Sequence, residues 1–337
     1  GTSILMDILS ENSWIHERAA GWRLLAIAIL AVWMGGCGPA PTANQGALDP
    51  AATTSPVPPT ASSVAIVTAT GTAAPAPTPS IAPPATATAA ALPSPTIPPP
   101  PSPTPEPDRS VRIIAVGDML PHDAVNLRAY DPATGDHDYT KFMAGVTPVF
   151  ARADVRLCNQ EAPSSPHHPT TGYPRFNAPP AFARDLQRQG CNLIQLANNH
   201  LADYGQPGID GTLETWDTLS TLAVAGASRT AEEQAQPRRF TRDGIRFAFV
   251  AFTEYSNQPI SAPYALNLLT EPLVASQLAG ARAEADVVIA AVHWGPENVA
   301  EPSDSQRYWA RRLAELGADS IVGSGPHVLQ PVEWLPT

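Results

Sequence analysis

Residues 196–205 of this 337-residue chain, with the sequence LANNHLADYG, bring two amides, an imidazole and a carboxylate together. They follow a short apolar run that is typical of a buried strand. In open α/β sheets, ligands bind at the carboxyl ends of the strands. We therefore expect a functional loop at such an end, formed by Asn198, Asn199, His200 and Asp203.

Other strand-like runs also end in side chains that can bind metal ions. These side chains are Asp118, Asn159, Glu161, His293, Glu297 and His327. Taken singly, each is more often a turn, a cap or a structural residue. Their recurrence at the same end of successive strands instead predicts a metal site, because carboxylates, amides and imidazoles are ligands for Zn, Mn and Fe. One or two divalent ions fit such a set, and paired ions can activate water.

Strand-like and helix-like segments alternate from residue 111 onward. Apolar runs predict strands at 111–116, 153–158, 193–196, 238–241, 245–252, 286–292 and 319–323. Composition predicts helices at 182–189, 208–222 and 303–316. Asp243-Gly244 between two of the strands is a hairpin signal. The pattern predicts an α/β domain with mainly parallel pairing and some antiparallel strand.

The first 37 residues have the features of a secretory signal. Arg18 and Arg23 precede an apolar run at 24–34, which is shorter than the roughly 20 residues of a membrane-spanning helix. Met34-Gly35-Gly36-Cys37 resembles the lipobox of bacterial lipoproteins. We expect lipidation at Cys37, an anchor in the bacterial cell membrane and an extracytoplasmic location; the alternative is an uncleaved anchor with an incidental cysteine.

Residues 38–108 are rich in Pro, Ala, Thr and Ser, and the chain as a whole holds 39 prolines. Such a segment buries too little apolar surface to fold, so we expect a disordered, semi-rigid linker. The net charge of −11 argues against nucleic acid as a partner, because phosphate binding needs clustered basic residues.

The remaining residues, 109–337, are expected to form one domain that contains two cysteines. A disulfide is permitted outside the cytoplasm. Cys158 ends its predicted strand and Cys191 precedes its own. In parallel strands this offset exceeds the roughly 7 Å reach of a disulfide between Cα atoms. The sequence therefore predicts that Cys158 and Cys191 are not bonded to each other.

The order of the motifs resembles the CapA family of poly-γ-glutamate capsule synthesis proteins. The motifs are Gly-Asp, Asn-x-Glu, Ala-Asn-Asn-His-x-x-Asp-Tyr-Gly, His-Trp-Gly-x-Glu and Gly-x-x-Pro-His-Val-Leu-Gln-Pro, spread over about residues 111–333. That family is similar to calcineurin-like metallophosphatases. The resemblance implies a four-layer α/β-β-α sandwich with a metal centre at the strand ends.

The resemblance also implies roles for individual residues. The implied metal ligands are Asp118, Glu161, Asn199, His293 and His327. His200 is the implied catalytic histidine, and Asp203 would orient it, as carboxylates commonly do. Residues expected around this group or against the substrate are Asn159, Asn198, Glu297 and Arg175, the last of which is equally compatible with an exposed loop position.

The chain departs from the superfamily and family patterns in three respects, the first of which the CapA branch generally shares. The superfamily's first motif has a histidine where this chain has Leu120, and His122 is close but out of register. The last motif of the family usually reads His-Pro-His, but here Gly325 replaces the first histidine. A ligand of one metal is therefore missing, so we expect a weak second ion or a single one. The family also continues past residue 337, so we expect a domain that is incomplete at its C-terminus, with an exposed sheet edge.

Three functions remain open from the sequence. The first is a membrane-tethered, metal-dependent hydrolase that uses metal-activated water on poly-γ-glutamate or a related anionic envelope polymer, with His200 as general acid. The second is a non-catalytic accessory subunit that binds the polymer or its synthase and assists export, which Gly325 favours. The third is a surface adhesin, which only the linker supports.

Overall fold

The computed structural model describes residues 3–6, 23–25, 29–30 and 109–335. Most of the predicted signal sequence, the lipidation site Cys37 and the linker at 38–108 lie outside these residues. Among the residues that are described, no helix combines the length and hydropathy needed to cross a bilayer.

The first sheet is parallel throughout and has seven strands in the described residues. Its order is β2-β1-β4-β7-β8-β9, and β3 also pairs with β4. The bounds are β1 Ser3–Met6, β2 Arg23–Leu25, β3 Ile29–Leu30, β4 Ser110–Met119, β7 Val155–Gln160, β8 Leu193–Gln195 and β9 Ala223–Ala225. The central strands carry apolar residues on both faces, as expected for parallel strands covered on both sides.

The second sheet has the order β10-β11-β12-β13. Its strands are β10 Arg238–Arg242, β11 Ile245–Thr253, β12 Val287–His293 and β13 Ser320–Ser324. The predicted Asp243-Gly244 hairpin is confirmed, because β10 is antiparallel to β11 and both turn residues have positive φ. The other pairings in this sheet are parallel. A separate two-stranded ribbon joins β5 Tyr130–Asp131 to β6 Asp136–His137.

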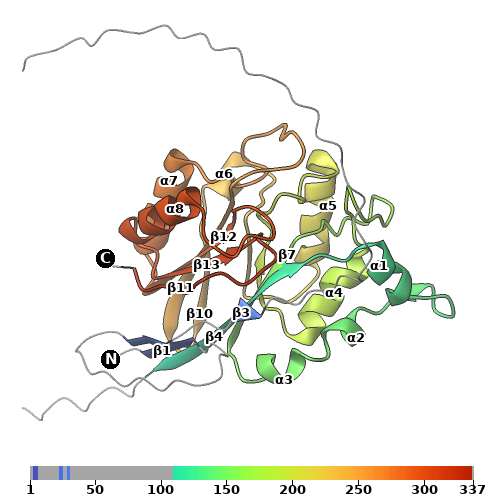
Figure 1. Cartoon of the computed structure of the whole chain (residues 1–337), viewed down its shortest axis with the longest axis horizontal. Coiled ribbons are helices and arrows are strands. Elements are labelled where there is room, and N and C mark those ends of the chain that lie inside the picture. Colours follow the sequence, from blue (N-terminus) through green and yellow to red (C-terminus); the bar gives the residue numbers. More distant parts are fainter. Residues whose placement is uncertain (1–2, 7–22, 26–28, 31–108, 336–337) are drawn as a thin grey trace, which may run out of the picture. The chain divides into compact units, whose positions relative to one another are not determined.

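Two groups of helices cover the outer faces of the two sheets (Figure 1). The group beside the first sheet is α1 Asp123–Ala129, α2 Thr140–Met143, α3 Thr147–Phe150, α4 Pro180–Gln189 and α5 Gly205–Asp217. The group beside the second sheet is α7 Glu271–Arg282 and α8 Asp304–Glu315. The short helix α6, Ala231–Gln234, precedes β10.

Alternation along β11 shows how the layers are held together. Phe247, Phe249 and Ala251 point into a core shared with the first sheet, whereas Ala248 and Val250 point into a second core with α7 and α8. Successive strand residues face opposite sides, so one strand serves two cores. The expected four-layer α/β-β-α sandwich is confirmed, and it is compatible with a metallophosphatase-like fold.

A bulge in β4 aims the first site residue. Val116 pairs with Cys158 and Asp118 pairs with Asn159, so Gly117 is the extra residue between them. A β-bulge redirects the side chain that follows it. The strand predicted here ends at residue 116, but the observed strand continues through Asp118 to Met119.

Several short elements were not predicted. They are α1, α2, α3, α6, β1, β2, β3, β5, β6 and β9, together with the longer helix α7. The helix predicted at 208–222 instead begins at Gly205 and ends at Asp217. The remaining predicted strands and helices match observed elements to within a few residues.

The prediction that Cys158 and Cys191 are unbonded is wrong. Their sulfurs form a disulfide, and their Cα atoms lie 5.9 Å apart. The strand register pairs Cys158 with Ile194, three residues after Cys191, as the sequence suggested. Cys191, however, still belongs to the end of α4, because its amide donates to the Leu186 carbonyl. The chain therefore does not run straight from Cys191 into β8, and the expected offset along the strand does not arise.

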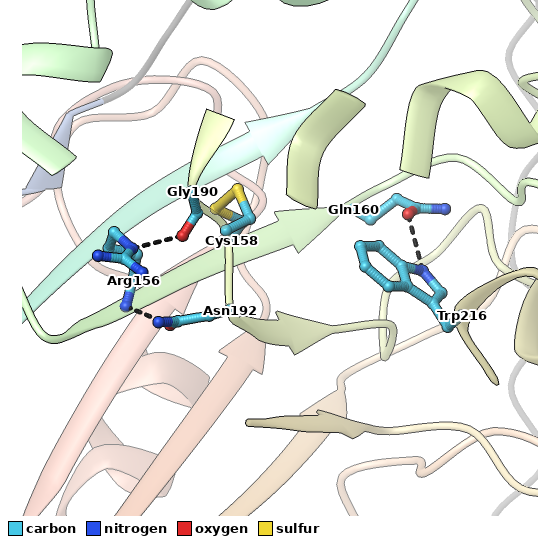
Figure 2. The surroundings of a disulfide bond; sticks show 7 residues. Arg156, Cys158, Gln160, Gly190, Asn192 and Trp216 are labelled. Atoms are coloured by element: carbon cyan, nitrogen blue, oxygen red, sulfur yellow. Dashed lines mark hydrogen bonds between the residues drawn. A yellow bond between two sulfur atoms is a disulfide. The ribbon is translucent and has the colours of Figure 1, made fainter. Parts of the chain in front are cut away.

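Polar contacts to β7 lie on both sides of the disulfide (Figure 2). The Arg156 amide donates to the side-chain oxygen of Asn192 at 2.7 Å, and the Arg156 guanidinium donates to the Gly190 carbonyl. Beyond the disulfide, the Trp216 indole donates to Gln160 at 2.9 Å. The first two contacts join the start of β7 to the segment that leads into β8, and the third joins the end of β7 to α5.

We predict that the disulfide makes a large contribution to stability. It closes a loop with a sequence separation of 33 residues, for which the chain-entropy argument gives about 3–4 kcal/mol. A double Cys158→Ala/Cys191→Ala variant should therefore lose about that much unfolding free energy in denaturant titrations. A loss of less than about 1 kcal/mol would contradict this, and the wild-type chain unfolded under reducing conditions serves as the control.

Candidate metal centre

The carboxyl ends of the two sheets meet where the predicted ligands lie. Asp118 and Asn159 come from β4 and β7 of the first sheet, and His293 ends β12 of the second. The Nδ1 atom of His293 lies 3.7 Å from the Asp118 carboxylate and 3.3 Å from the Asn159 amide nitrogen. Residues far apart in sequence thus converge at one edge, as the strand-end pattern predicted.

Asp118 and His327 form the most exposed pair of the cluster. His327 Nδ1 lies 2.8 Å from the Asp118 carboxylate, and the Gly325 amide donates to both oxygens of that carboxylate at 3.1 and 3.2 Å. Burial alone would raise the pKa of Asp118, but the hydrogen bond with His327 and the nearby His293 hold it below the usual value. The same hydrogen bond raises the pKa of His327.

Glu161 is a buried carboxylate of the centre that lacks hydrogen-bond partners within the described part of the chain. Its side chain is fully buried, and neither carboxylate oxygen has a hydrogen-bond partner among the described residues. Burial, followed by the charges of Asp118, Glu297 and Asp203, raises its pKa well above the usual value. A buried carboxylate is costly unless it is paired or coordinates a metal.

The donor set fits a divalent metal ion. Ligand atoms of Asp118, Glu161 and His327 all lie within 4.8 Å of one another. His293 Nε2 lies 3.7 Å from Glu161, and burial lowers the pKa of His293 to about 4, which keeps its imidazole neutral and able to bind a metal. Asn199 is buried in the loop after β8, and its side-chain oxygen also lacks a partner among the described residues.

His200 and Asp203 form a coupled pair beside this cluster. His200 Nδ1 lies 2.8 Å from Asp203 Oδ2, and Phe176 donates its backbone amide to the same oxygen at 2.7 Å. The Phe176 ring also contacts the His200 ring edge-on at 4.6 Å. The carboxylate and the phenyl ring therefore fix the imidazole orientation, which leaves Nε2 as the nitrogen that can meet a substrate.

The two asparagines expected around the ligands connect the strand ends. Asn159 donates to the Asp118 carboxylate at 2.8 Å. Asn198 donates to the Gln160 carbonyl at 2.7 Å and accepts from the His200 amide at 3.1 Å. Both asparagines thus hold backbone and side chains in position around the cluster.

Glu297 and Arg175 occupy different surroundings. Glu297 is half exposed, and its carboxylate lies 3.8 Å from His327 Nε2 at the mouth of the centre. Arg175 donates from Nε to the Asp203 carbonyl at 2.8 Å and lies over the Tyr204 ring at 5.0 Å. These contacts give Arg175 a structural role in holding the loop that carries Asp203.

Gly325 is more than a missing histidine. Its φ is 109°, a conformation that residues with a side chain rarely adopt, and a Cβ there would lie 2.8 Å from the Trp294 carbonyl oxygen. His327 in the same loop also has positive φ, at 58°. The loop is therefore built around glycine, and a histidine at 325 would require the backbone to move.

Sequence reasoning missed three residues that border the centre. Burial and the nearby imidazoles of His200 and His327 lower the pKa of His122, which places it at the rim. Tyr255 and Asn257 follow β11; the Tyr255 ring lies 6.4 Å from that of His293, and the Asn257 amide nitrogen is 3.4 Å from both nitrogens of His200. The available signal was the polar run after β11, whose carboxyl end lies at the same sheet edge.

Comparison with known proteins agrees with the motifs. The family model described as "Bacterial capsule synthesis protein PGA_cap" matches residues 112–336. The "PGA biosynthesis protein CapA" of Bacillus subtilis (strain 168) is 32% identical over 153 residues, which cover 44% of this chain and 40% of that protein. The "Capsule biosynthesis protein CapA" of Bacillus anthracis is 31% identical over 153 residues, which cover 43% of this chain and 37% of that protein.

The chain thus spans 40% or less of the length of these two curated relatives. The family match, in contrast, extends over more than half of this chain and includes every strand end that contributes to the metal centre. The chain therefore belongs to the family of bacterial capsule synthesis proteins.

Proposed function

We propose that this chain is a metal-dependent hydrolase of capsule biosynthesis that acts on poly-γ-glutamate or a related anionic envelope polymer outside the cytoplasm. The observation that carries the proposal is the buried Glu161 carboxylate, whose two oxygens lack a hydrogen-bond partner among the described residues. The names of the two CapA relatives support the biosynthetic context. Attachment to the cell membrane through Cys37 is part of the proposal and rests on the lipobox sequence alone.

The proposed chemistry divides among the residues by position. Asp118, Glu161 and His327 would hold one ion, and His293 and Asn199 would contribute to a second. A bound divalent ion supplies a Lewis acid that lowers the pKa of water and polarises the scissile group. His200, held at Nδ1 by Asp203, would deliver a proton from Nε2 to the leaving group.

A non-catalytic accessory subunit is the second candidate. The glycine-specific loop at Gly325 favours it, because that loop removes a ligand the family usually supplies. The unpartnered oxygens of Glu161 and Asn199 count against it, since a polymer-binding surface has no need of buried, unpaired acceptors.

Replacing the central carboxylate tests the metal site. Removing a residue that only supports a metal ligand typically lowers metal affinity by roughly 10–100-fold. Glu161→Gln removes a proposed ligand itself, so it should lower metal affinity by more than that. The metal-free variant should be no less stable than the wild type, because a neutral amide of similar shape replaces a buried carboxyl group that has no hydrogen-bond partner among the described residues. Metal content by elemental analysis and unfolding by denaturant measure the two effects.

The matched control is Glu214→Gln, whose carboxylate pairs with His167 on the surface. It should leave metal content unchanged. Equal metal content in Glu161→Gln and the wild type, or loss of stability in the metal-free Glu161→Gln variant, would contradict the assignment.

Replacing His200, the predicted general acid, distinguishes a hydrolase from a non-catalytic accessory subunit. His200→Ala should keep the metal and lower turnover by about 10²–10⁴-fold, the usual range for general acid–base catalysis. Release of product from poly-γ-glutamate and from an activated phosphodiester measures turnover. The exposed His167→Ala is the control; a His200→Ala variant as active as that control would rule out this role.

A further inference from the structure

The segment after β11 carries a tyrosine to the mouth of the metal centre. Thr253, the last residue of β11, pairs with His293 at the end of β12. Tyr255 therefore lies two residues beyond the level of that imidazole. The two rings are inclined at 59°, with centroids 6.4 Å apart, and 36% of Tyr255 is exposed. One part of the ring is covered, and the rest is open to a ligand.

Hydrogen bonds at both ends of residues 254–257 hold this segment to the end of β12 and to the loop after β8. The Glu254 amide donates to the His293 carbonyl at 2.9 Å, and the Asn257 amide donates to the Asn199 carbonyl at 2.9 Å. The Thr253 hydroxyl donates to the Tyr255 carbonyl at 2.8 Å. Tyr255 thus lies between the proposed ligand His293 and the loop of His200, on backbone that is held in place before any substrate arrives.

Glu254 adds a second support from the neighbouring elements. Its carboxylate accepts from the Gly295 amide at 2.9 Å and from the Ser305 hydroxyl at 2.5 Å. Gly295 follows β12, and Ser305 lies in the first turn of α8. Glu254 is engaged by these two donors, and the Asn257 amide faces His200, so Tyr255 is the side chain of this segment that lies beside His293.

The Tyr255 hydroxyl has no hydrogen-bond partner among the described residues, although the carboxylates of Glu297, Glu161 and Asp118 lie near enough to act on it electrostatically. A phenol can donate to an anionic oxygen. A metal ion bound by the cluster would offset the negative charge of these carboxylates, so that an anion could lie beside them and accept from the phenol.

We propose that the Tyr255 hydroxyl binds an anionic oxygen of the substrate, from a phosphoryl or a carboxylate group, beside the metal centre. The inference rests on the proposed function, because it assigns the substrate-facing side of the same site. Tyr255 then selects for an oxyanion and orients it between His200 and the metal cluster. It contributes binding and position, and it is not a metal ligand.

The test uses Tyr255→Phe in the full chain loaded with Mn²⁺. This change keeps the ring over His293 and removes only the hydroxyl. Calorimetry with two probes, inorganic phosphate and the dipeptide γ-glutamylglutamate, measures binding of phosphoryl and carboxylate oxygens separately. The control is Tyr308→Phe, because Tyr308 lies on α8 and is 54% exposed.

We expect unchanged metal content and about a tenfold loss of affinity for at least one probe, the effect of removing one hydrogen bond to a charged group. Loss for phosphate alone assigns a phosphoryl oxygen, and loss for the dipeptide alone assigns a carboxylate. Affinities for both probes within about twofold of wild type, or a wild-type chain that binds neither probe, would overturn the inference.

The two proposals can fail separately. Wild-type protein that hydrolyses nothing but binds an oxyanion through Tyr255 would contradict the hydrolase and support this inference. Hydrolysis by the wild type, with oxyanion affinity that is the same in Tyr255→Phe, would contradict this inference and leave the hydrolase intact.

Discussion

Burying a carboxylate away from hydrogen-bond donors costs free energy, and in this structure that cost falls on Glu161. The residue follows β7, and its amide donates to the Met119 carbonyl of β4, which fixes the backbone beneath it. Its oxygens nonetheless meet no donor among the described residues. A divalent cation would relieve that cost and could be bound by Asp118 and His327 at the same time.

The four-layer sandwich supplies the rigidity that such a site needs. The two sheets share a core, so residues of β4 and β12 meet at fixed distances although they lie far apart in sequence. The bulge at Gly117 turns Asp118 toward the junction, and the disulfide between Cys158 and Cys191 holds β7 to the crossover that leads into β8. The site therefore lies on strands and short anchored loops, which position ligands more accurately than long loops do.

The sequence predicted well which polar residues lie together, because polar residues directly after the apolar runs of parallel strands gather at one sheet edge. Asp118, Glu161 and His327 converge as expected. The predictions from sequence were wrong where a residue's position depends on how a loop joins the neighbouring helix or strand. Cys191 still belongs to the end of α4, so the strand-offset argument against the disulfide did not apply. Tyr255 and Asn257 belong to a polar run after β11, but only the hairpin signal at the other end of that strand entered the prediction. The need for glycine at position 325 likewise depends on Trp294, a residue distant in sequence, whose carbonyl oxygen would lie 2.8 Å from an added Cβ.

The central claim is that the Glu161 carboxylate exists to bind a metal ion together with Asp118 and His327. Anomalous diffraction from crystals of the chain soaked in Zn²⁺, recorded on both sides of the zinc absorption edge, tests it most directly. We expect a zinc peak with ligand atoms of all three residues at about 2.0–2.2 Å. Zinc found only elsewhere on the protein, with both oxygens of Glu161 still without a partner, would contradict it.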